Sequence, residues 1–252
     1  MSTLGEAQVS IIMPAYNCED FIGATIESVI TQTYENWELI IIDDCSTDHT
    51  SDKVQFYASR DHRIHYECLK HNSGAAVARN RAVEKARGKY VAFLDSDDLW
   101  VREKLSKQIA FMKEHQYTFT CTSYQKIDEE GKSLNQQISA NYRRDYHGLL
   151  RTSAGNSTVM YDAEILGKCY VADIKKRNDY LMWLQVIQRT TYLYGLNEPL
   201  CSYRVRRKSL SSNKSSLLKY HWQVYRKHER LSVVYSCFLM FYFVFFTVFK
   251  LR

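Results

Sequence analysis

The run Asp95-Ser96-Asp97-Asp98 places three carboxylates directly after the apolar segment KYVAFL. Carboxylates crowded at the end of a buried strand repel one another, so they are costly unless a cation lies between them. A hard divalent ion held by one or two carboxylates together with diphosphate oxygens satisfies that requirement. The alternative interpretation of this short motif is an aspartate that only caps a helix expected over 99–115.

Polar groups that could bind a nucleotide occur at two other places in the sequence. Asp44 follows the apolar segment ELIIID, and its carboxylate suits base N–H or ribose hydroxyl groups. Gly74 opens a predicted helix whose start can receive phosphate, and Arg79 supplies a planar fork for diphosphate or base. The alternative for Asp44 is a helix cap shared with Thr47 and Asp48. The sequence contains neither GxGxxG nor GxxxxGK(S/T), which disfavours dinucleotide oxidoreductases and P-loop enzymes.

The elements that must position these residues alternate between strand and helix through the first hundred residues. Apolar, β-branched runs predict strands over 9–13, 38–43, 63–69 and 89–95, and helical spacing predicts helices from Asp20, over 48–59 and over 75–87. This alternation predicts an α/β fold with a mostly parallel central sheet covered by helices on both faces. Ligands bind beyond the carboxyl ends of such strands, which is where the acidic run and Asp44 fall.

The remaining sequence predicts one large domain with an appendage. The chain has 252 residues, of which 45% are hydrophobic and 25% charged, as in ordinary globular proteins. Residues 128–156 are expected to form an irregular loop, 157–161 a strand and 177–190 a helix. Seven scattered cysteines without a CxxC pair disfavour a metal finger or a disulfide framework and indicate a reducing compartment.

The C-terminal tail is basic and then strongly apolar. Nine basic residues and one acidic residue lie between positions 204 and 230, whereas 231–249 contains no charge. Basicity confined to the tail disfavours a nucleic-acid binder and suits an anionic cytoplasmic leaflet. A 19-residue helix would be about 28 Å long, close to the apolar thickness of a bilayer. We expect an inserted or fully buried helix here, with a core helix or a subunit interface as the alternative to membrane.

Several motifs, in this order, resemble the family-2 inverting glycosyltransferases, which have the GT-A nucleotide-sugar fold. The matching pieces are VSIIMPAYN, QTYENWELIIIDDCSTD, NSGAAVARN, GKYVAFLDSDD and RNDYLMWLQ, and the resemblance covers residues 8–206. The sequence is most similar to bacterial members that build capsule, lipopolysaccharide or teichuronic acid. The ordered combination is specific, although each piece alone is not.

The resemblance implies a role for each matching residue of the nucleotide-sugar site. Pro14, Ala15 and Tyr16 would line the nucleotide pocket, Asp44 would hold the base, Arg79 would support the nucleotide, and Asp95 with Ser96 would face the ribose or metal. Asp97 would be the principal ligand of Mn²⁺ or Mg²⁺, and Asp98 would share that task.

The resemblance also supplies a catalytic base, Asp179, and an aromatic neighbour one helical turn on, Trp183. Inverting transfer is a direct displacement at the anomeric carbon, so a single carboxylate that takes the proton of the acceptor hydroxyl suffices. The metal neutralises the departing diphosphate. The alternative for Asp179 is a helix N-terminal carboxylate on a solvated face.

The sequence departs from the family after the base. Many relatives have YRxH where this chain has Tyr203-Arg204-Val205-Arg206. A guanidinium does not bind a metal, but Arg204, Arg206 or the following Arg207 could clamp a diphosphate. The alternative is a solvated basic loop.

These observations predict a metal-dependent inverting glycosyltransferase at the cytoplasmic face of the cell membrane. A nucleotide sugar, expected to be a UDP-sugar, would be the donor, and a lipid-linked or growing cell-surface polysaccharide the acceptor. Catalytic domain 1–206 would precede a basic helical linker, 207–230, and a membrane-associating segment, 231–252. Other polysaccharide-assembly proteins are possible partners. The alternatives are a non-catalytic nucleotide-sugar-binding or scaffold subunit and a nucleotidyltransferase, which would need a Gly-rich basic motif where PAYN stands.

Overall fold

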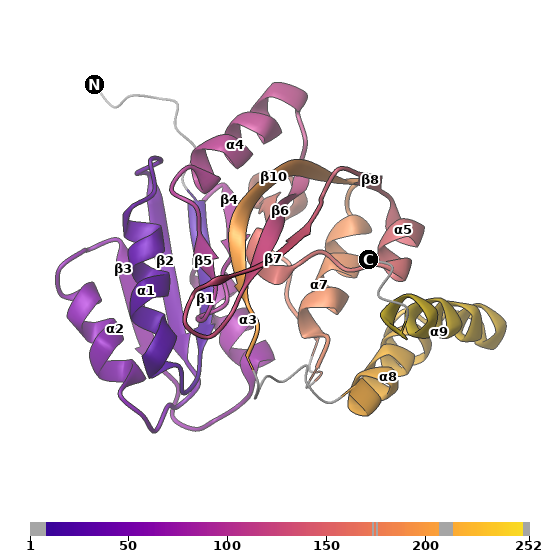
Figure 1. The fold of residues 1–252 in the computed structure, drawn as a ribbon, viewed down its shortest axis with the longest axis horizontal. Helices are drawn as coiled ribbons and strands as arrows, with labels where there is room; N and C mark the ends of the chain where they lie inside the picture. The colour runs from indigo at the N-terminus through magenta and orange to yellow at the C-terminus, as the bar shows by residue number, and fades with distance from the viewer. Residues whose placement is uncertain (1–8, 173, 175, 207–213, 249–252) are drawn as a thin grey trace.

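The computed structural model describes residues 9–172, 174, 176–206 and 214–248. Strands and helices alternate through its first part, as the sequence predicts (Figure 1). These elements are β1 (Val9–Ala15), α1 (Glu19–Ile30), β2 (Trp37–Asp43), α2 (Thr50–Ala58), β3 (Ile64–Cys68), α3 (Ala75–Lys85) and β4 (Tyr90–Phe93).

The second part of the chain mixes short strands with helices. Its elements are β5 (Leu99–Trp100), α4 (Lys104–His115), β6 (Phe119–Ile127), β7 (Ser133–Ile138), β8 (Arg143–Arg144), α5 (Tyr146–Arg151), the 3-10 turn η1 (Asn156–Thr158), β9 (Met160–Asp162), α6 (Ala163–Leu166), α7 (Asn178–Ile187) and β10 (Leu193–Arg204). A helical hairpin follows, formed by α8 (Lys214–Gln223), the π-helical turn η2 (Val224–His228) and α9 (Val233–Val248).

The central sheet is mixed, so the expectation of a mostly parallel sheet is correct only for its first half. The strand order is β3-β2-β1-β4-β9-β6-β10-β5, with β7 on β6 and β8 on β10. Strands β1 to β4 pair in parallel, whereas β9 pairs antiparallel with both β4 and β6. The reversal arises because η1 already lies at the carboxyl end of β4, so a strand that begins there must run back along the sheet.

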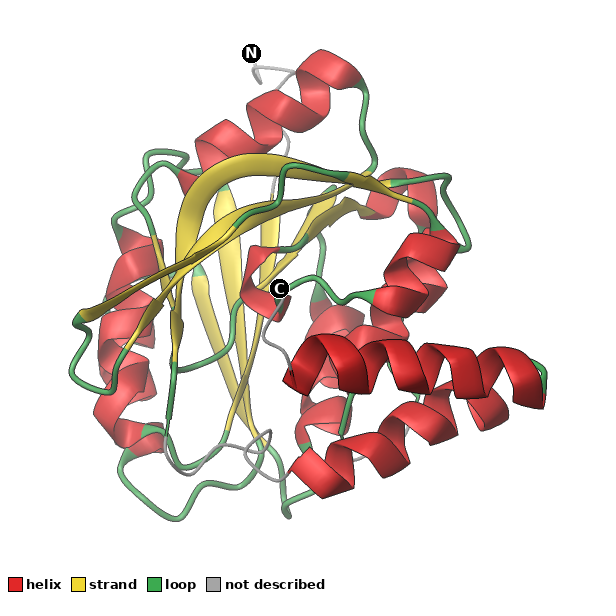
Figure 2. Cartoon of the chain, turned by 45° about the vertical axis from the view of Figure 1, so that its right-hand side comes forward, coloured by secondary structure: helices red, strands yellow, loops and turns green. Residues whose placement is uncertain are grey.

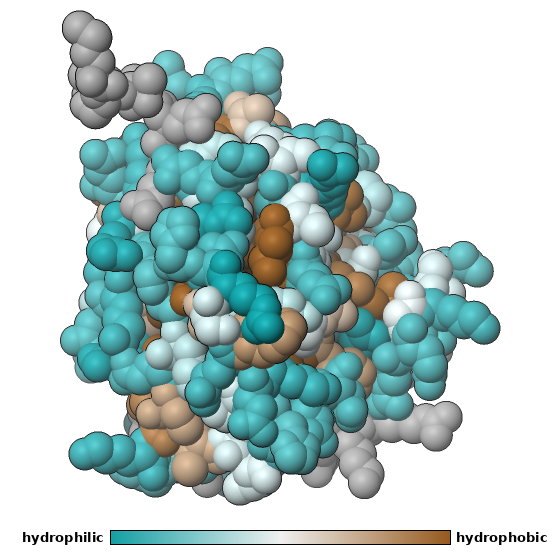
Figure 3. All heavy atoms as spheres, turned by 90° about the vertical axis from the view of Figure 1, so that its left-hand side faces the viewer, coloured by the Kyte–Doolittle hydropathy of each residue, from teal (hydrophilic) through white to brown (hydrophobic). Residues whose placement is uncertain are grey.

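Helices cover both faces of the sheet, as predicted. A hydrophobic core lies on each face of the sheet, and alternate residues of β1 pack into one or the other. Ile12 packs with residues of α3 and α7, whereas Ile11 and Met13 pack with residues of α1, α2 and α4. Successive side chains of a strand point to opposite faces, so the uniformly apolar run found by sequence is what a doubly covered strand requires. The surface on the side of α1 and α2 is mostly hydrophilic (Figure 3).

The loop expected over 128–156 is wrong, because this stretch contains β7, β8 and α5. Strand β7, SLNQQI, is polar because five of its six residues are exposed. It forms a hairpin with β6 through a turn in which Gly131 has φ +85°, a conformation that favours glycine. A two-sided polar strand has no hydrophobic alternation, so its sequence does not distinguish it from a loop.

The C-terminal hairpin packs beside α5, as Figure 2 shows. The alternative of a fully buried core helix is wrong: along α9, Val234 is 82% exposed while Leu239 is 1% exposed. Insertion into a membrane stays a prediction. Among residues 9–206 and 214–248, apart from 173 and 175, no helix reaches the length and hydrophobicity needed to cross a membrane. Residues 207–213 and 249–252 lie outside the described part of the chain.

Candidate active site

The carboxyl edge of the parallel strands brings the predicted nucleotide residues together. Ala15 is the register partner of Asp43, and its carbonyl accepts the backbone N–H of Asp44 at 2.8 Å. The next residue, Tyr16, is 48% exposed. Pro14, one register step back on β1, is half-buried. The end of β1 therefore lies against the end of β2, with an aromatic ring available at the surface.

Asp44 holds the loop that precedes α3. Its buried carboxylate accepts the N–H of Ser73 at 2.6 Å and the N–H of Gly74 at 2.8 Å. Gly74 has φ +92°, so a glycine is favoured there. The helix-cap interpretation of Asp44 is wrong, because the amides that it binds belong to the loop before α3 and not to the first turn of α2 or α3. A role in base recognition stays a prediction.

Arg79 joins the acidic turn to the helix that carries Asp179. Arg79 is 4% exposed. Nη1 donates a short hydrogen bond to Oδ1 of Asn178, and Nη2 lies 3.4 Å from Oδ1 of Asp95. These two partners are far apart in sequence, one at the end of β4 and the other at the start of α7. Arg79 therefore fixes the distance between the two halves of the site.

Asp95 is the electrostatic centre of the site. Besides its contact with Arg79, its carboxylate accepts Nδ2 of Asn156 at 2.7 Å. Burial raises the pKa of Asp95 to about 6, and the negative charges of Asp97 and Asp179 act in the same direction while Arg79 opposes them. The effect of Asp179 on Asp95 means that the predicted base lies within electrostatic reach of the acidic turn.

Asp179 occupies the first turn of α7 and is partly exposed. Its carboxylate accepts no hydrogen bond from any residue that the structure describes, so it is available to a substrate. Trp183, predicted as its aromatic neighbour, instead lies in the core, where its ring packs edge-on against Phe93 at a centroid distance of 4.8 Å. Trp183 therefore seats α7 on β4 and does not line the site.

Asp98 and Ser96 face the protein interior around the acidic turn. Asp98 is 1% exposed, and its oxygens accept the Ser157 hydroxyl at 2.5 Å and the Arg204 N–H at 2.9 Å. Burial, followed by the charges of Asp97 and Asp95, raises the pKa of Asp98 well above its usual range. The carbonyl of Ser96 accepts the hydroxyl of Thr25 on α1.

Asp97 is partly open to solvent, with its side chain 22% exposed, as is Asp95 at 34%. Nη1 of Arg206 forms an ion pair with the Asp97 carboxylate at 3.1 Å. Arg204 plays another part: it is buried, and its guanidinium donates to the backbone carbonyls of Asp97, Asp128 and Glu129. Arg206, and not Arg204, is therefore placed to exchange partners. Arg207 falls outside the described residues.

The donor set of this turn fits a divalent ion that is completed by a substrate. Asp97 offers a partly exposed carboxylate that already binds a cationic group, and Asp95 lies close enough for their charges to interact. Throughout the described residues, no group of three or more His, Cys, Asp or Glu could hold a metal by itself. One or two carboxylates with phosphate oxygens is a usual Mg²⁺ arrangement.

Sequence interpretation missed three polar residues that organise the site. Asn156 and Ser157 of η1 bind Asp95 and Asp98, and Asn178 receives Arg79. All three are buried. The only signal in the sequence is a small polar run, GNST, before an apolar strand, and such runs more often form turns.

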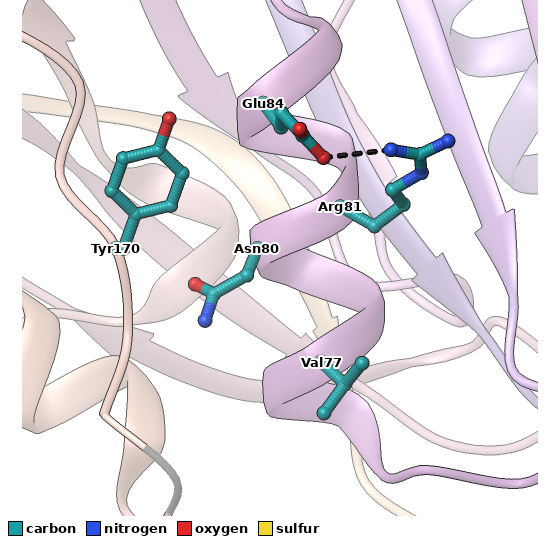
Figure 4. Close-up of a pocket in the computed structure, with 5 residues that line it drawn as sticks. All are labelled: Val77, Asn80, Arg81, Glu84 and Tyr170. Atoms are coloured by element: carbon teal, nitrogen blue, oxygen red, sulfur yellow. Dashed lines mark hydrogen bonds and ion pairs between the residues drawn. The ribbon is translucent and has the colours of Figure 1, made fainter.

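A hollow of about 360 Å³ lies outside this site, between α3 and the segment before α7 (Figure 4). Val77, Asn80, Arg81, Glu84 and Tyr170 line it. Arg81 forms an ion pair with Glu84 at 2.7 Å, and the side chain of Asn80 exchanges two hydrogen bonds with the backbone of Val171. The charges here are already paired, so the hollow adds no reactive group to the site.

Known proteins of similar sequence are bacterial glycosyltransferases. A putative teichuronic acid biosynthesis glycosyltransferase of Bacillus subtilis, TuaG, is 46% identical over 224 residues, covering 88% of this chain and 89% of its own length. The Escherichia coli UDP-Glc:alpha-D-GlcNAc-diphosphoundecaprenol beta-1,3-glucosyltransferase WfgD is 38% identical over 218 residues, covering 86% and 84%.

Solved structures share the fold at lower identity. S. aureus TarS in complex with UDP-GlcNAc matches with a TM-score of 0.73 at 22% identity, over 94% of this chain and 71% of that one. A Pyrobaculum calidifontis mannosyltransferase in complex with GDP-Man and Mn²⁺ matches with a TM-score of 0.67 at 17% identity, over 91% and 66%. The α/β arrangement is thus that of GT-A glycosyltransferases.

The family assignment follows from the motifs, the edge of the sheet where they meet, and these relatives. Glycosyl transferase family 2 matches residues 10–173, which include the predicted donor-site residues from Pro14 to Asp98. Asp179 lies just beyond that match, within the longer alignments to the bacterial enzymes. Catalysis of glycosyl transfer, and not a scaffold role, is therefore the function, and the chain belongs to glycosyl transferase family 2.

Proposed function

We propose that this protein is a metal-dependent, inverting glycosyltransferase in which Asp179 is the catalytic base. The observation that carries the proposal is the bridge made by Arg79, which binds Asn178 on one side and Asp95 on the other. Because Asn178 directly precedes Asp179, this bridge holds the candidate base beside the acidic turn. A base and a diphosphate-binding group on opposite sides of one sugar are what a direct displacement requires.

Asp179 would accept the proton of the acceptor hydroxyl as its oxygen forms a bond to the anomeric carbon. The bond from that carbon to the donor diphosphate breaks in the same displacement, so the anomeric configuration inverts. Asp97 would hold Mn²⁺ or Mg²⁺, with Asp95 and Asp98 nearby, and the ion would supply positive charge for the diphosphate oxygens. Asp98 is the less suitable ligand because both its oxygens already accept protein hydrogen bonds.

The donor nucleotide would lie along the ends of β1 and β2. Pro14, Ala15 and Tyr16 would contact the nucleotide, and Asp44 the base, while Arg79 and Ser96 complete the ribose and diphosphate side. A UDP-sugar is favoured because the name of the E. coli relative WfgD specifies UDP-Glc and the TarS structure contains UDP-GlcNAc. Arg206 could leave Asp97 and contact the diphosphate, as the sequence suggests.

We infer that the acceptor is a lipid-linked or growing cell-surface polysaccharide at the cytoplasmic face of the membrane. This is supported by relatives whose names specify teichuronic acid or a diphosphoundecaprenol-linked sugar. In this proposal residues 1–206 form the catalytic domain, 207–230 the basic linker and 231–252 the membrane-associating segment. Other polysaccharide-assembly proteins would meet the enzyme at that surface.

The proposal is tested by following release of the nucleoside diphosphate from a panel of nucleotide sugars, with Mn²⁺ and membrane extract as the acceptor source. At least one donor should be consumed, and chelation of the metal or Asp97→Asn should slow release by about 100-fold or more. Asp52→Asn, which removes an exposed carboxylate on α2, is the matched control and should behave as wild type. Consumption of no donor, or undiminished release by Asp97→Asn, would contradict the proposal.

A further inference from the structure

Helix α9 has two faces of different environment. From 233 to 245 its exposed residues recur three and four positions apart: Val233, Val234, Cys237, Phe238, Phe241, Val244 and Phe245. Ser236, Leu239 and Phe243, on the opposite side, are buried. Residues at this spacing form one stripe on a helix, so α9 presents a continuous apolar surface to the outside.

The buried side of α9 packs against α8 and α5. The Phe243 ring lies 3.9 Å from the ring of His221 on α8, and the Tyr235 hydroxyl lies 3.1 Å from Nδ1 of His147 on α5. The helix therefore has a fixed orientation. Among the described residues, the outer stripe stays open to solvent, with Val234 82% and Phe241 71% exposed.

Positively charged residues precede this apolar stripe in the chain. Lys219, Lys227 and Arg230 are exposed on the segments that lead into α9. Residues 231–249 themselves carry no charge. The other side of the molecule, over α1 and α2, is instead mostly hydrophilic (Figure 3). An uncharged aromatic stripe preceded by cations is complementary to an acyl-chain boundary beneath anionic headgroups.

We propose that α9 lies flat in the surface of an anionic bilayer, with its exposed stripe in the acyl boundary and its other face on the protein. Sixteen helical residues extend about 24 Å, less than the apolar thickness of a bilayer of about 30 Å. An in-plane helix needs only one apolar face, which is what α9 has free. A second copy of the chain fits less well, because pairing through α9 would bring two basic segments together.

The contacts of α9 also extend to the start of α7, the helix that carries the candidate base. The Arg177 guanidinium lies 5.4 Å from the Phe243 ring centroid, and Arg177 directly precedes Asn178 and Asp179. A membrane held by α9 would thus lie near the base that meets the acceptor. This point rests on the proposed function, whereas binding of α9 to lipid does not.

The test is flotation of the full-length protein with phosphatidylglycerol vesicles and with phosphatidylcholine vesicles, without donor or acceptor. Wild type should float with phosphatidylglycerol, more weakly with phosphatidylcholine, and less at high salt. Phe241→Glu and Val234→Glu, which place charge on the outer stripe, should each reduce binding at least about tenfold. Phe56→Glu, at a phenylalanine of α2 that is 52% exposed against 71% for Phe241, is the matched control and should bind as wild type.

Circular dichroism should show that each variant is folded, and transfer to a water-soluble acceptor should be unchanged in all of them. Wild type that fails to float, or Phe241→Glu that floats as wild type does, overturns the proposal. Loss of self-association in Phe241→Glu, without vesicle binding by wild type, overturns it in favour of a second copy. Vesicle binding without any sugar transfer contradicts the proposed function and leaves the lipid contact standing.

Discussion

Arg79 shows how one residue sets the geometry of the site. Its planar guanidinium binds Asn178 and Asp95 with two separate nitrogens, and lysine cannot reproduce that fork. Arg79→Lys should therefore lower kcat by about 10- to 100-fold, since misplacing a positioned group has effects of that order. Steady-state kinetics with the preferred donor measures this.

A matched control for this substitution lies on the same helix. Arg81 is more exposed and pairs with Glu67 and Glu84 away from the site, so Arg81→Lys should keep wild-type kinetics. A purely structural role for Arg79 predicts a lower melting temperature with unchanged kcat in the folded fraction. That outcome, or equal effects of the two substitutions, would contradict its role as a positioning residue.

Lys104 is a buried cation whose protonation should make stability depend on pH. Its Nζ lies 3.7 Å from the Trp100 ring centroid and, among the described residues, has no hydrogen-bond partner. Burial lowers the pKa of Lys104 to about 7, whereas an unfolded lysine titrates near 10.4. Between these values the unfolded chain binds a proton that the folded chain has lost, so this group makes the free energy of unfolding rise with pH.

Lys104→Met isolates that contribution. From pH 7 to pH 9 the wild type should gain about 2 kcal/mol of unfolding free energy relative to the variant, as measured by urea denaturation. Comparison with the variant removes the tyrosines and cysteines that also titrate in this range. A difference between the two proteins that does not change with pH would mean that Lys104 keeps an ordinary pKa.

Single residues were predictable from sequence where a motif and a strand end coincide, as for Asp44, Asp95 and Asp97. The residues that hydrogen-bond to this part of the site were not predictable. Asn156 and Asn178 reach the site from 61 and 99 positions away, and no local pattern encodes contacts at such separations. Trp183 was placed one turn from Asp179 correctly, but its burial against Phe93 depends on how α7 lies on the sheet.

Among the elements, β10 depends on one glycine. A Cβ at Gly195 would lie 1.6 Å from the carbonyl oxygen of Ala140, which is backbone and cannot turn aside. Gly195→Ala should therefore destabilise the protein by about 2–3 kcal/mol, as overpacking does. Chemical denaturation measures this, and Gly23→Ala, where the nearest atom is 3.5 Å away, is a control for loss of glycine in a helix. Equal stability of Gly195→Ala and wild type would show that the segments around Gly195 and Ala140 can move apart without loss of stability.

Elements whose hydrophobic residues recur with a clear period were predicted well. Elements whose exposure or strand direction is not expressed in such a pattern were not. The first four strands and three helices follow the sequence closely. The polar strand β7 and the reversed strand β9 do not, because exposure and strand direction are set by neighbouring elements. The sequence of α9 is apolar on every side, so it does not reveal which side meets the protein.

At the scale of the whole molecule, the site joins two parts of the chain. The acidic turn and the nucleotide residues belong to the alternating first half, whereas Asp179 comes from α7, which lies between β9 and β10 of the mixed half. Our central claim is that these parts act on a single donor. Removal of the base should then stop the chemistry without preventing the nucleotide from binding.

The most direct test is therefore Asp179→Asn, with UDP and Mn²⁺ binding measured by calorimetry and sugar transfer measured on the same preparation. Because asparagine keeps the shape of the side chain but accepts no proton, we predict binding within about threefold of wild type and transfer reduced by about 10²–10⁴-fold. Transfer at the wild-type rate, or equal loss of binding and transfer, would contradict the account.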